Sequence, residues 1–304
     1  MATRHDHSRL TFWVTVLPPT VWVAVFFLIP LGIVWLYSFG ENRGLTDVAL
    51  SGTFANYFRA FEPLYLQIFA KSMFVAGVTT LLCLIIGFPV ALAIVFASER
   101  WRAWLLLLVM LPFWTNLLIR TYALIAVLRT EGFANFTFEW LWNNASGVMT
   151  FAGFQPLGEF QPLQMLYNNF AVVLGLVYVH LPFMVLPLYA ALDRLDKSLM
   201  EASLDLGAGH LRTLYSIVIP LAMPGIISGI IITFVPALGA YLTPDLLGGP
   251  DSQMIANVIE RQFKRANDWP FGAALSFLLM YATFIAIALR AYLTRGQATD
   301  AHGI

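Results

Sequence analysis

Residues 196–220 read DKSLMEASLDLGAGHLRTLYSIVIP, a charged segment between two long apolar runs. Carboxylates crowd its first turns, where they suit the positive end of a helix dipole. Ser198 followed by Glu201 three positions later is a capping-box pattern, and Gly207 can end a helix with a positive φ. The stretch therefore predicts a short helix capped by Ser198 that ends at a glycine turn before the next apolar run.

The composition of the whole chain indicates a membrane protein. Of the 304 residues, 59% are hydrophobic and 11% are charged, whereas soluble domains carry about 25% charged residues. The formal net charge is zero, which leaves no basic footprint for nucleic-acid binding. The single cysteine, Cys83, can form no intrachain disulfide and is by itself a poor metal site. We expect no metal site and no cofactor in this chain.

Six apolar runs are long enough to cross a bilayer, which takes about 20 residues. Backbone groups in lipid must bond internally, so each run is predicted to be a helix and the fold to be all-α. The first run is too long for a cleaved signal core, and no A-x-A site follows it. The predicted spans are residues 17–39, 72–97, 104–128, 170–192, 221–242 and 271–293.

The links between these runs suggest a domain layout and an orientation. We expect an N-terminal tail, first span and outer loop at 1–67, a five-helix domain at 68–293, and a tail at 294–304. The short link at 98–103 holds Arg100 and Arg102, which favours a cytoplasmic location for that link and for both termini. The long link at 129–169 could hold a short amphipathic helix on the membrane near 136–142.

The spacing within the opening stretch resembles the EAA loop of ABC-importer permeases. Glu201, Ala202 and Ser203 are followed by three residues, then Gly207, then nine residues, then the I-x-I-P end at Pro220. The family pattern has a second alanine at Ser203 and a leucine in place of the second isoleucine. The resemblance implies a cytoplasmic coupling helix that docks on a separate ATPase, with Glu201, Ala202, Ser203, Asp205 and Gly207 at the contact.

The chain carries no nucleotide-binding loop that could power transport by itself. It has no G-x-x-x-x-G-K-[ST] sequence and no Gly-Lys pair at all. We therefore expect this subunit not to be an enzyme, and expect ATP and Mg²⁺ to bind on the partner ATPase.

A wider resemblance covers most of the chain, from residue 72 to about 293. It looks like the transmembrane domain of type I (MetI-like) importers, and LPFWTNLLIRTYA at 111–123 and PDLLGGPDSQMIANVIERQF at 244–263 look like the B-type permease of spermidine/putrescine importers. The resemblance implies a homologous second permease, two cytoplasmic ATPase subunits and a periplasmic binding protein in the bacterial inner membrane. Related permeases import ferric iron, phosphonates, opines and other small solutes, so these cargoes remain alternatives.

Five residues are candidates for the transport path. Trp114 is expected near mid-bilayer, where its indole face suits an alkylammonium, and Asn116 is costly in lipid unless it faces a helix or cavity. Tyr241, Asp245 and Glu260 belong to the link before the last span, where carboxylates could attract a cation. For these two carboxylates, the alternatives are contact with the binding protein or a solvated face.

Arg120 and His180 are polar residues inside predicted spans. A fixed cation repels a polyamine, so Arg120 is expected to pair with a carboxylate or reach outward; an anionic cargo would reverse this assignment. His180 is expected to be a hydrogen-bonded packing residue rather than a proton relay.

Two other functional classes are compatible with a multi-span chain. An ion-driven secondary transporter would need inverted repeats and carboxylates at mid-span, but the spans contain almost no Asp or Glu. A membrane-embedded enzyme would need a cluster of His, Asp, Glu or Cys near one membrane face. No such pattern, including H-E-x-x-H, occurs in the sequence.

Overall fold

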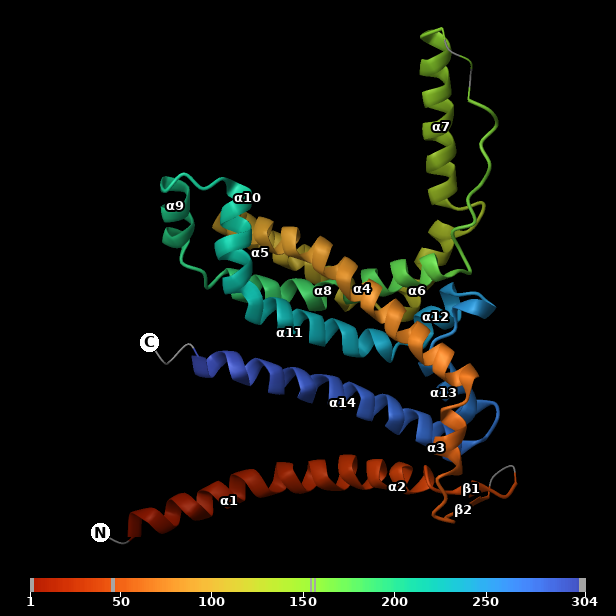
Figure 1. The fold of residues 1–304 in the computed structure, drawn as a ribbon, viewed down its shortest axis with the longest axis vertical. Coiled ribbons are helices and arrows are strands. Elements are labelled where there is room, and N and C mark those ends of the chain that lie inside the picture. The colour runs from red at the N-terminus through yellow and green to blue at the C-terminus, as the bar shows by residue number, and fades with distance from the viewer. Residues whose placement is uncertain (1–2, 45–46, 154, 156, 301–304) are drawn as a thin grey trace. The chain divides into compact units, whose positions relative to one another are not determined.

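The computed structural model describes residues 3–44, 47–153, 155 and 157–300, and the fold is almost entirely helical (Figure 1). The chain divides into two compact units. One comprises residues 1–66 and 258–304, and the other comprises residues 67–257. Each unit is described separately, and the domain boundaries expected from the sequence stay a prediction.

The first unit pairs the N-terminal helices with the last one. It contains α1 (Thr3–Val23), a π-helical turn (Ala24–Leu28), α2 (Ile29–Tyr37), α3 (Ala55–Ala60) and α14 (Trp269–Asp300). Two short strands, β1 (Glu41–Asn42) and β2 (Val48–Ala49), form an antiparallel hairpin in which Glu41 faces Ala49. This hairpin is a small addition to the all-α fold that the sequence predicts. α14 packs on α2 and α3, and Trp35 Nε1 donates to Tyr281 Oη at 2.8 Å.

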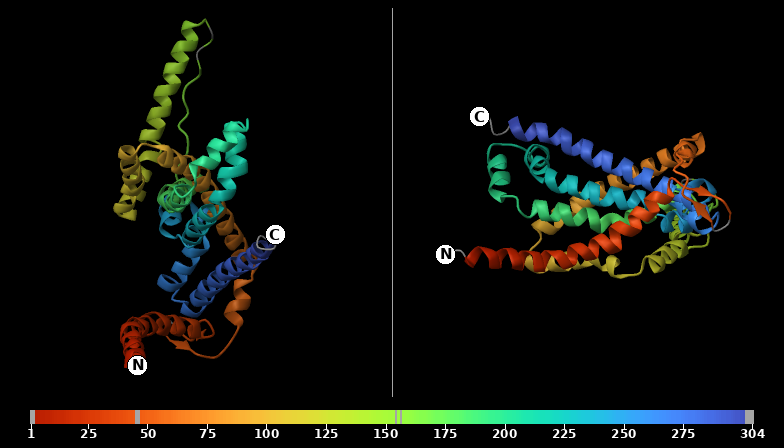
Figure 2. Two further views of the ribbon diagram at one scale, coloured as in Figure 1. Left: turned by 90° about the vertical axis from the view of Figure 1, so that its left-hand side faces the viewer. Right: turned by 90° about the horizontal axis from the view of Figure 1, so that it is seen from below.

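The second unit is a helical bundle whose main pair is α8 (Asn169–Leu192) and α11 (Ile219–Leu238). Its core joins these helices to α4 (Pro63–Phe96), with Cys83, Met184 and Ala222 fully buried. Small residues allow the close approach, because a Cβ on Gly225 would collide with Ala191 Cβ and lie 2.7 Å from Pro187 O. Figure 2 shows α8 and α11 side by side from two further directions.

The remaining elements of the second unit connect these long helices. They are α5 (Glu99–Met110), a 3₁₀ turn (Leu111–Trp114), α6 (Leu117–Leu128), α7 (Phe133–Phe151), α9 (Lys197–Asp205), α10 (His210–Thr213), a π-helical turn (Leu214–Val218), α12 (Leu242–Leu247) and a 3₁₀ turn (Pro250–Ser252). Helix α13 (Ile255–Lys264) begins in this unit and ends in the other.

All six predicted spans fall on helices, with differences in their bounds. Four helices of the described chain are long and apolar enough to cross a membrane: Phe12–Tyr37, Pro63–Phe96, Asn169–Leu192 and His210–Leu238. A bent pair provides a fifth crossing if it is taken as one span, and Trp269–Ile285 is a shorter apolar helix. The number of apolar segments agrees with a six-span protein.

The third predicted span is not the continuous helix expected over 104–128. It breaks at Thr115 and Asn116, and Glu99–Trp114 is bent by 95° from Leu117–Phe151. Pro112 has no N–H to continue the helix ladder, and Thr115 Oγ1 donates to its carbonyl at 2.7 Å. Asn116 then starts α6 as its N-cap, accepting from Leu118 N–H at 2.8 Å.

The link at 129–169 holds a longer helix than the sequence predicts. α7 covers Phe133–Phe151, whereas the expected amphipathic helix was confined to 136–142. The chain then returns along α7, and Asn135 exchanges two hydrogen bonds of 2.9 Å with the backbone of Leu163. These contacts make α7 and the returning segment 157–165 one structure, which we call the α7 arm.

Candidate functional site

The α9 loop, residues 196–213, has the helix and glycine turn that the sequence predicts. Gly207 has φ = +84°, and its N–H donates to Leu204 O at 2.9 Å. Ala208 N–H donates to Ser203 O at 3.1 Å. This bond pair is a Schellman motif, which satisfies the last carbonyls of a helix and reverses the chain through a left-handed residue. Gly207 therefore sets the path of the chain from α9 to α10.

The helix is capped by Asp196, so the predicted capping role of Ser198 is wrong. Asp196 Oδ1 accepts from Ser198 N–H at 2.9 Å, and this hydrogen bond lowers the pKa of the Asp196 carboxyl. With Asp196 as N-cap, Glu201 lies too far along the helix to complete a capping box. The Glu201 carboxylate makes no hydrogen bond or ion pair within the described part of the chain.

Ser203, where the EAA pattern has a second alanine, joins the two arms of the loop. Its hydroxyl lies 3.0 Å from Thr213 Oγ1, and Thr213 is buried at the end of α10. Sequence reasoning did not identify this link, although a Ser and a Thr on either side of a glycine turn are a signal for it. The link holds α9 against α10 while Ala202 remains exposed.

A partly open cavity of about 410 Å³ lies between α9, the end of α4 and the turn after α10. Glu201, Lys197 and Met200 line it on one side, and Leu92 and Phe96 line it on the other. Lys197 Nζ lies 6.0 Å from the Phe96 ring, the outer limit of a cation–π contact. Glu201 thus lines a recess with largely apolar walls.

The loop also exposes apolar side chains among its charges. Leu206 is 89% exposed and Leu211 is 71% exposed, while Glu201 and Asp205 are exposed on α9. Residues four apart share a helix face, so these two carboxylates form one acidic side. The exposed surface of the loop thus combines this acidic side with two apolar side chains.

Trp114 and Asn116 lie at the break in the third span. Trp114 ends the 3₁₀ turn and is 75% exposed. The Asn116 side chain caps α6, which explains how this polar residue is accommodated between two apolar helices. Their position at a helix break leaves irregular backbone at membrane depth, which occurs where it is buried in protein or lines a cavity.

Tyr241 and Asp245 lie just before and within α12, which follows the C-terminal end of α11. Tyr241 is 42% exposed and precedes α12, while its carbonyl accepts from Asn257 Nδ2 at 2.8 Å. Asp245 is exposed in the first turn of α12. Sequence reasoning missed Asn257 and Ser72, two buried polar residues that hold the segment after α12 in place. Asn257 bonds the Tyr241 carbonyl, and Ser72 Oγ accepts from Ile255 N–H at 2.8 Å.

Glu260 belongs to the first unit and is not an unpaired carboxylate. Its Oε1 lies 3.1 Å from Lys264 Nζ, one helical turn along α13. The predicted path residues lie at the α5–α6 break, at and just before α12, and in α13, and none of them lines either of the two described pockets.

Among the residues that the structure describes, no carboxylate pairs with Arg120, contrary to one of the two expectations for it. Its Nε and Nη1 atoms are buried and have no hydrogen-bond partner in the part of the chain that the structure describes. His180 is buried, and its Nδ1 lies 2.8 Å from Leu176 O, which confirms the packing interpretation. Cys83 is likewise fully buried, as expected for a small apolar residue.

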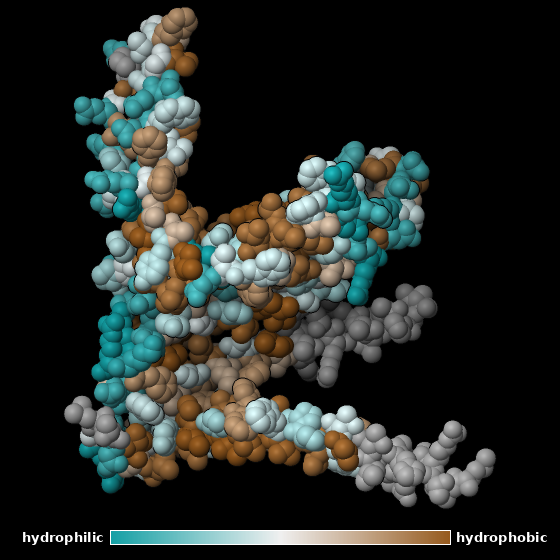
Figure 3. All heavy atoms as spheres, turned by 180° about the vertical axis from the view of Figure 1, so that it is seen from behind, coloured by the Kyte–Doolittle hydropathy of each residue, from teal (hydrophilic) through white to brown (hydrophobic). Residues whose placement is uncertain are grey.

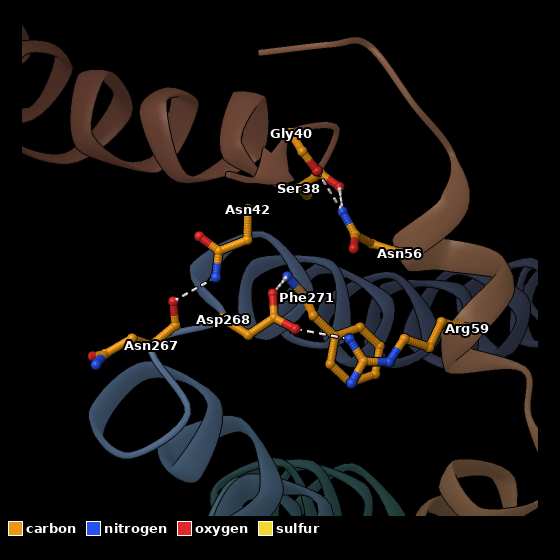
Figure 4. Close-up of polar contacts among 8 residues, drawn as sticks. All are labelled: Ser38, Gly40, Asn42, Asn56, Arg59, Asn267, Asp268 and Phe271. Atoms are coloured by element: carbon orange, nitrogen blue, oxygen red, sulfur yellow. Dashed lines mark hydrogen bonds and ion pairs between the residues drawn. The ribbon is translucent and has the colours of Figure 1, made fainter. Parts of the chain in front are cut away.

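A second polar centre, the Arg59 cluster, lies in the first unit and comprises Asn42, Arg59, Asn267, Asp268 and Phe271 (Figure 4). Arg59 Nη1 binds Asp268 Oδ2 at 2.7 Å, and its guanidinium lies 4.0 Å from the centre of the Phe271 ring. Partial burial, the largest single influence, lowers the pKa of Arg59, but the hydrogen bond to Asp268 and the interactions with Tyr65 and the Asp268 charge together outweigh burial, so the pKa is raised. Asn42 Nδ2 donates to Asn267 O at 3.0 Å.

The sequence matches a known protein family and several characterised relatives. The family model described as binding-protein-dependent transport system inner membrane component matches residues 7–298. The spermidine/putrescine transport system permease protein PotB of Escherichia coli K12 is 40% identical over 258 residues, which cover 85% of this chain and 88% of that protein. PotB of Haemophilus influenzae is 38% identical over 272 residues, 89% of this chain and 90% of the relative.

A solved structure shares the fold at low sequence identity. The bacterial ABC transporter involved in the import of the acidic polysaccharide alginate has a chain with a TM-score of 0.70 and 15% identity, covering 96% of this chain and 97% of that chain. Together with the family match over residues 7–298, these findings show that the chain belongs to the family of inner membrane components of binding-protein-dependent transport systems.

Proposed function

We propose that the chain is a polyamine-importing permease subunit whose α9 loop transmits the work of a separate ATPase. In this assembly a homologous permease completes the path, two cytoplasmic ATPase subunits bind ATP and Mg²⁺, and a periplasmic protein delivers the solute. Both termini lie in the cytoplasm, on the same side as the α9 loop.

The construction of the α9 loop carries the coupling proposal. Its shape is held by Asp196, Gly207 and the Ser203–Thr213 hydrogen bond, none of which uses the side chains of Glu201 or Asp205. A partner therefore finds two carboxylates, Ala202 and an exposed Leu206 already in place. Preorganisation of this kind lowers the ordering cost of binding.

The coupling role is tested by reversing one charge on the acidic side of α9. We expect Glu201→Lys to abolish ATP-dependent uptake and weaken binding of the ATPase, with normal amounts of protein in the membrane. Glu99→Lys is the matched control, because Glu99 is also exposed near a helix start but belongs to the 98–103 link. Normal uptake and ATPase binding by Glu201→Lys would disprove the coupling role.

The cargo proposal rests on the relatives, which are spermidine/putrescine permeases by name and match 85–89% of this chain. The exposed Trp114 at the α5–α6 break supports it, since an indole face attracts an alkylammonium by about 0.5–2 kcal/mol. Asn116, Tyr241, Asp245 and Glu260 remain further candidates for the path. Arg120 opposes a cationic cargo at close range, so it is assigned to contacts other than cargo.

The identity of the cargo is tested by measuring which solutes the periplasmic partner protein binds. We expect sub-micromolar binding of putrescine or spermidine, and uptake of the same compound by the reconstituted assembly. Tight binding of ferric iron, a phosphonate or an opine instead would replace the polyamine while leaving the coupling role intact.

A further inference from the structure

The α7 arm has one face that its own structure leaves uncovered. The returning segment packs on the side of α7 that carries Asn135 and Trp142, where Trp142 Nε1 donates to Gly158 O at 2.8 Å. At 100° per residue, Thr137 and Asn144 fall on the opposite side, together with five exposed apolar side chains. These are Phe133 (72% exposed), Phe136 (69%), Trp140 (60%), Val148 (69%) and Phe151 (96%).

Polar residues flank this apolar row and make α7 three-sided. Glu139, Asn143 and Thr150 follow one another along one edge, between the packed face and the exposed apolar face. In Figure 3, teal side chains gather along the edge of the arm on which the returning segment runs, whereas brown, tan and white side chains occupy the α7 edge. The arm is therefore amphipathic even after the returning segment has covered one of its faces.

The direction of the arm suits a membrane surface. The stretch Leu117–Phe151, which contains α6, a turn at 129–132 and α7, is bent by 95° from Glu99–Trp114. In Figure 1, α7 runs across the direction of α8 and α11, so a bilayer crossed along those helices has its surface close to the direction of α7. The joint is tight: a Cβ on Gly132 would lie 2.7 Å from Arg129 O, and Asn135 Nδ2 donates to Thr130 O at 3.0 Å. This joint fixes the arm relative to the end of α6.

The charge of the arm indicates which lipid feature it would recognise. Residues 130–168 contain Glu131, Glu139 and Glu159 but no lysine or arginine, so attraction to anionic headgroups cannot hold the arm. Trp and Phe are favoured at the lipid–water boundary, whatever the headgroup charge. A protein partner is the other occupant to consider, and the spin-label test distinguishes it from lipid.

We propose that the exposed face of α7 is seated in the lipid–water interface of the membrane, with Trp140 and its aromatic neighbours inserted among the lipids. The arm then acts as an anchor in the membrane plane for the α6–α7 corner. The proposed function enters only in assigning this interface to the periplasmic side.

Spin labels on the full chain in lipid nanodiscs test the proposal. In a Cys83→Ala background, Val148→Cys reports the apolar face and Asn143→Cys reports the polar edge. We expect the label at 148 to be accessible to oxygen and protected from a water-soluble nickel complex several-fold more than the label at 143. The pattern should be equal in phosphatidylcholine and in mixtures with phosphatidylglycerol.

A second pair, Phe151→Cys and Thr150→Cys, repeats the comparison one turn further along if either first variant fails to fold. Nickel access at 148 and 151 equal to that at 143 and 150 would overturn the proposal. Protection that arises only when the periplasmic binding protein is added would also overturn it, and would assign the face to that protein. Neither result depends on uptake, so it leaves the coupling role to its own test.

Discussion

The α9 loop and the Arg59 cluster are both small polar structures at helix ends, but they are held together differently. In the α9 loop, the longest-range side-chain bond joins Ser203 to Thr213, ten residues apart. In the Arg59 cluster, Arg59 and Asp268 are 209 residues apart, and Asn42 and Asn267 are 225 apart. The α9 loop is therefore held by local contacts, whereas the Arg59 cluster joins parts of the chain that are far apart in sequence.

This difference separates the side chains that are available for a partner from those used internally. The α9 loop is shaped by the Asp196 cap, backbone hydrogen bonds and one hydroxyl pair, which leaves the side chains of Glu201 and Asp205 exposed and without a described partner. The Arg59 cluster uses its charges on itself, and Asp268 also accepts from Phe271 N–H at 3.3 Å to cap α14. A substitution in the loop should therefore alter coupling, and one in the cluster should alter stability.

Among substitutions that alter the shape of either structure, the largest effect is expected at Gly207, because its backbone is in the left-handed region. Its φ of +84° costs a residue with a Cβ about 1–2 kcal/mol, and β-branched valine more. Gly207→Val should redirect the chain between α9 and α10 and lower ATP-dependent uptake at least tenfold, with normal membrane insertion. Uptake by membrane vesicles measures this.

Gly209 provides the matched control for Gly207, because it lies in the same loop with φ = −71° and open space around it. Gly209→Ala should transport as the unmodified chain does. If both variants lose uptake equally, the loop is intolerant of any substitution and the specific role of the left-handed turn is wrong.

A smaller effect is expected in the Arg59 cluster. The side chains of Arg59 and Asp268 are 42% and 20% exposed, so solvent screening limits the pair, and exposed pairs contribute about 0.2–1 kcal/mol. The ring contact with Phe271 adds about 0.5–1 kcal/mol. Arg59→Ala should therefore lower the free energy of unfolding by about 1 kcal/mol, seen as a lower Tm in detergent, while uptake persists.

Arg43→Ala is the control for Arg59→Ala, since Arg43 is an exposed arginine of the neighbouring hairpin whose side chain makes no described contact. It should leave the Tm unchanged. Loss of uptake without a change of Tm in Arg59→Ala would show that the cluster contributes directly to transport, contrary to the comparison with the α9 loop.

The same contrast explains what the sequence could predict. Gly207 and the α9 helix depend on neighbours within a few residues, and the apolar spans depend on composition, so both follow from local patterns. The Arg59–Asp268 pair and the Ser72–Ile255 hydrogen bond join residues far apart, and one sequence carries no signal for such pairings. The break at Asn116 is an intermediate case. Its Pro-x-x-Thr-Asn pattern is local, but the apolar residues on both sides led to the prediction of one continuous helix.

Two expectations from the sequence failed. Ser198 and Asp196 are both good N-caps, and the chain uses the earlier one, so the capping box with Glu201 does not form. The expectation for Arg120 failed for a different reason: it required a carboxylate from elsewhere in the fold, and none pairs with Arg120 in the described part of the chain.

The smallest effect is expected at Asp196, and only in acid. The hydrogen bond from Ser198 lowers the pKa of this exposed carboxyl below its ordinary 3.8. A carboxyl with a lower pKa in the folded state stabilises that state above the unfolded pKa, and the contribution is lost as the pH falls through the folded pKa. The first turn of α9 should therefore open below about pH 4 and be unchanged at neutral pH, as measured by amide exchange at Leu199 and Met200.

The control is Asp196→Asn, which keeps a capping oxygen without a titrating group. Amide exchange in this variant should not increase in acid; if it does, another group causes the opening. Because protonation removes one local cap and leaves Gly207 and the Ser203–Thr213 bond in place, the loop should loosen at its start alone, which is the behaviour of a structure held by several independent short-range contacts.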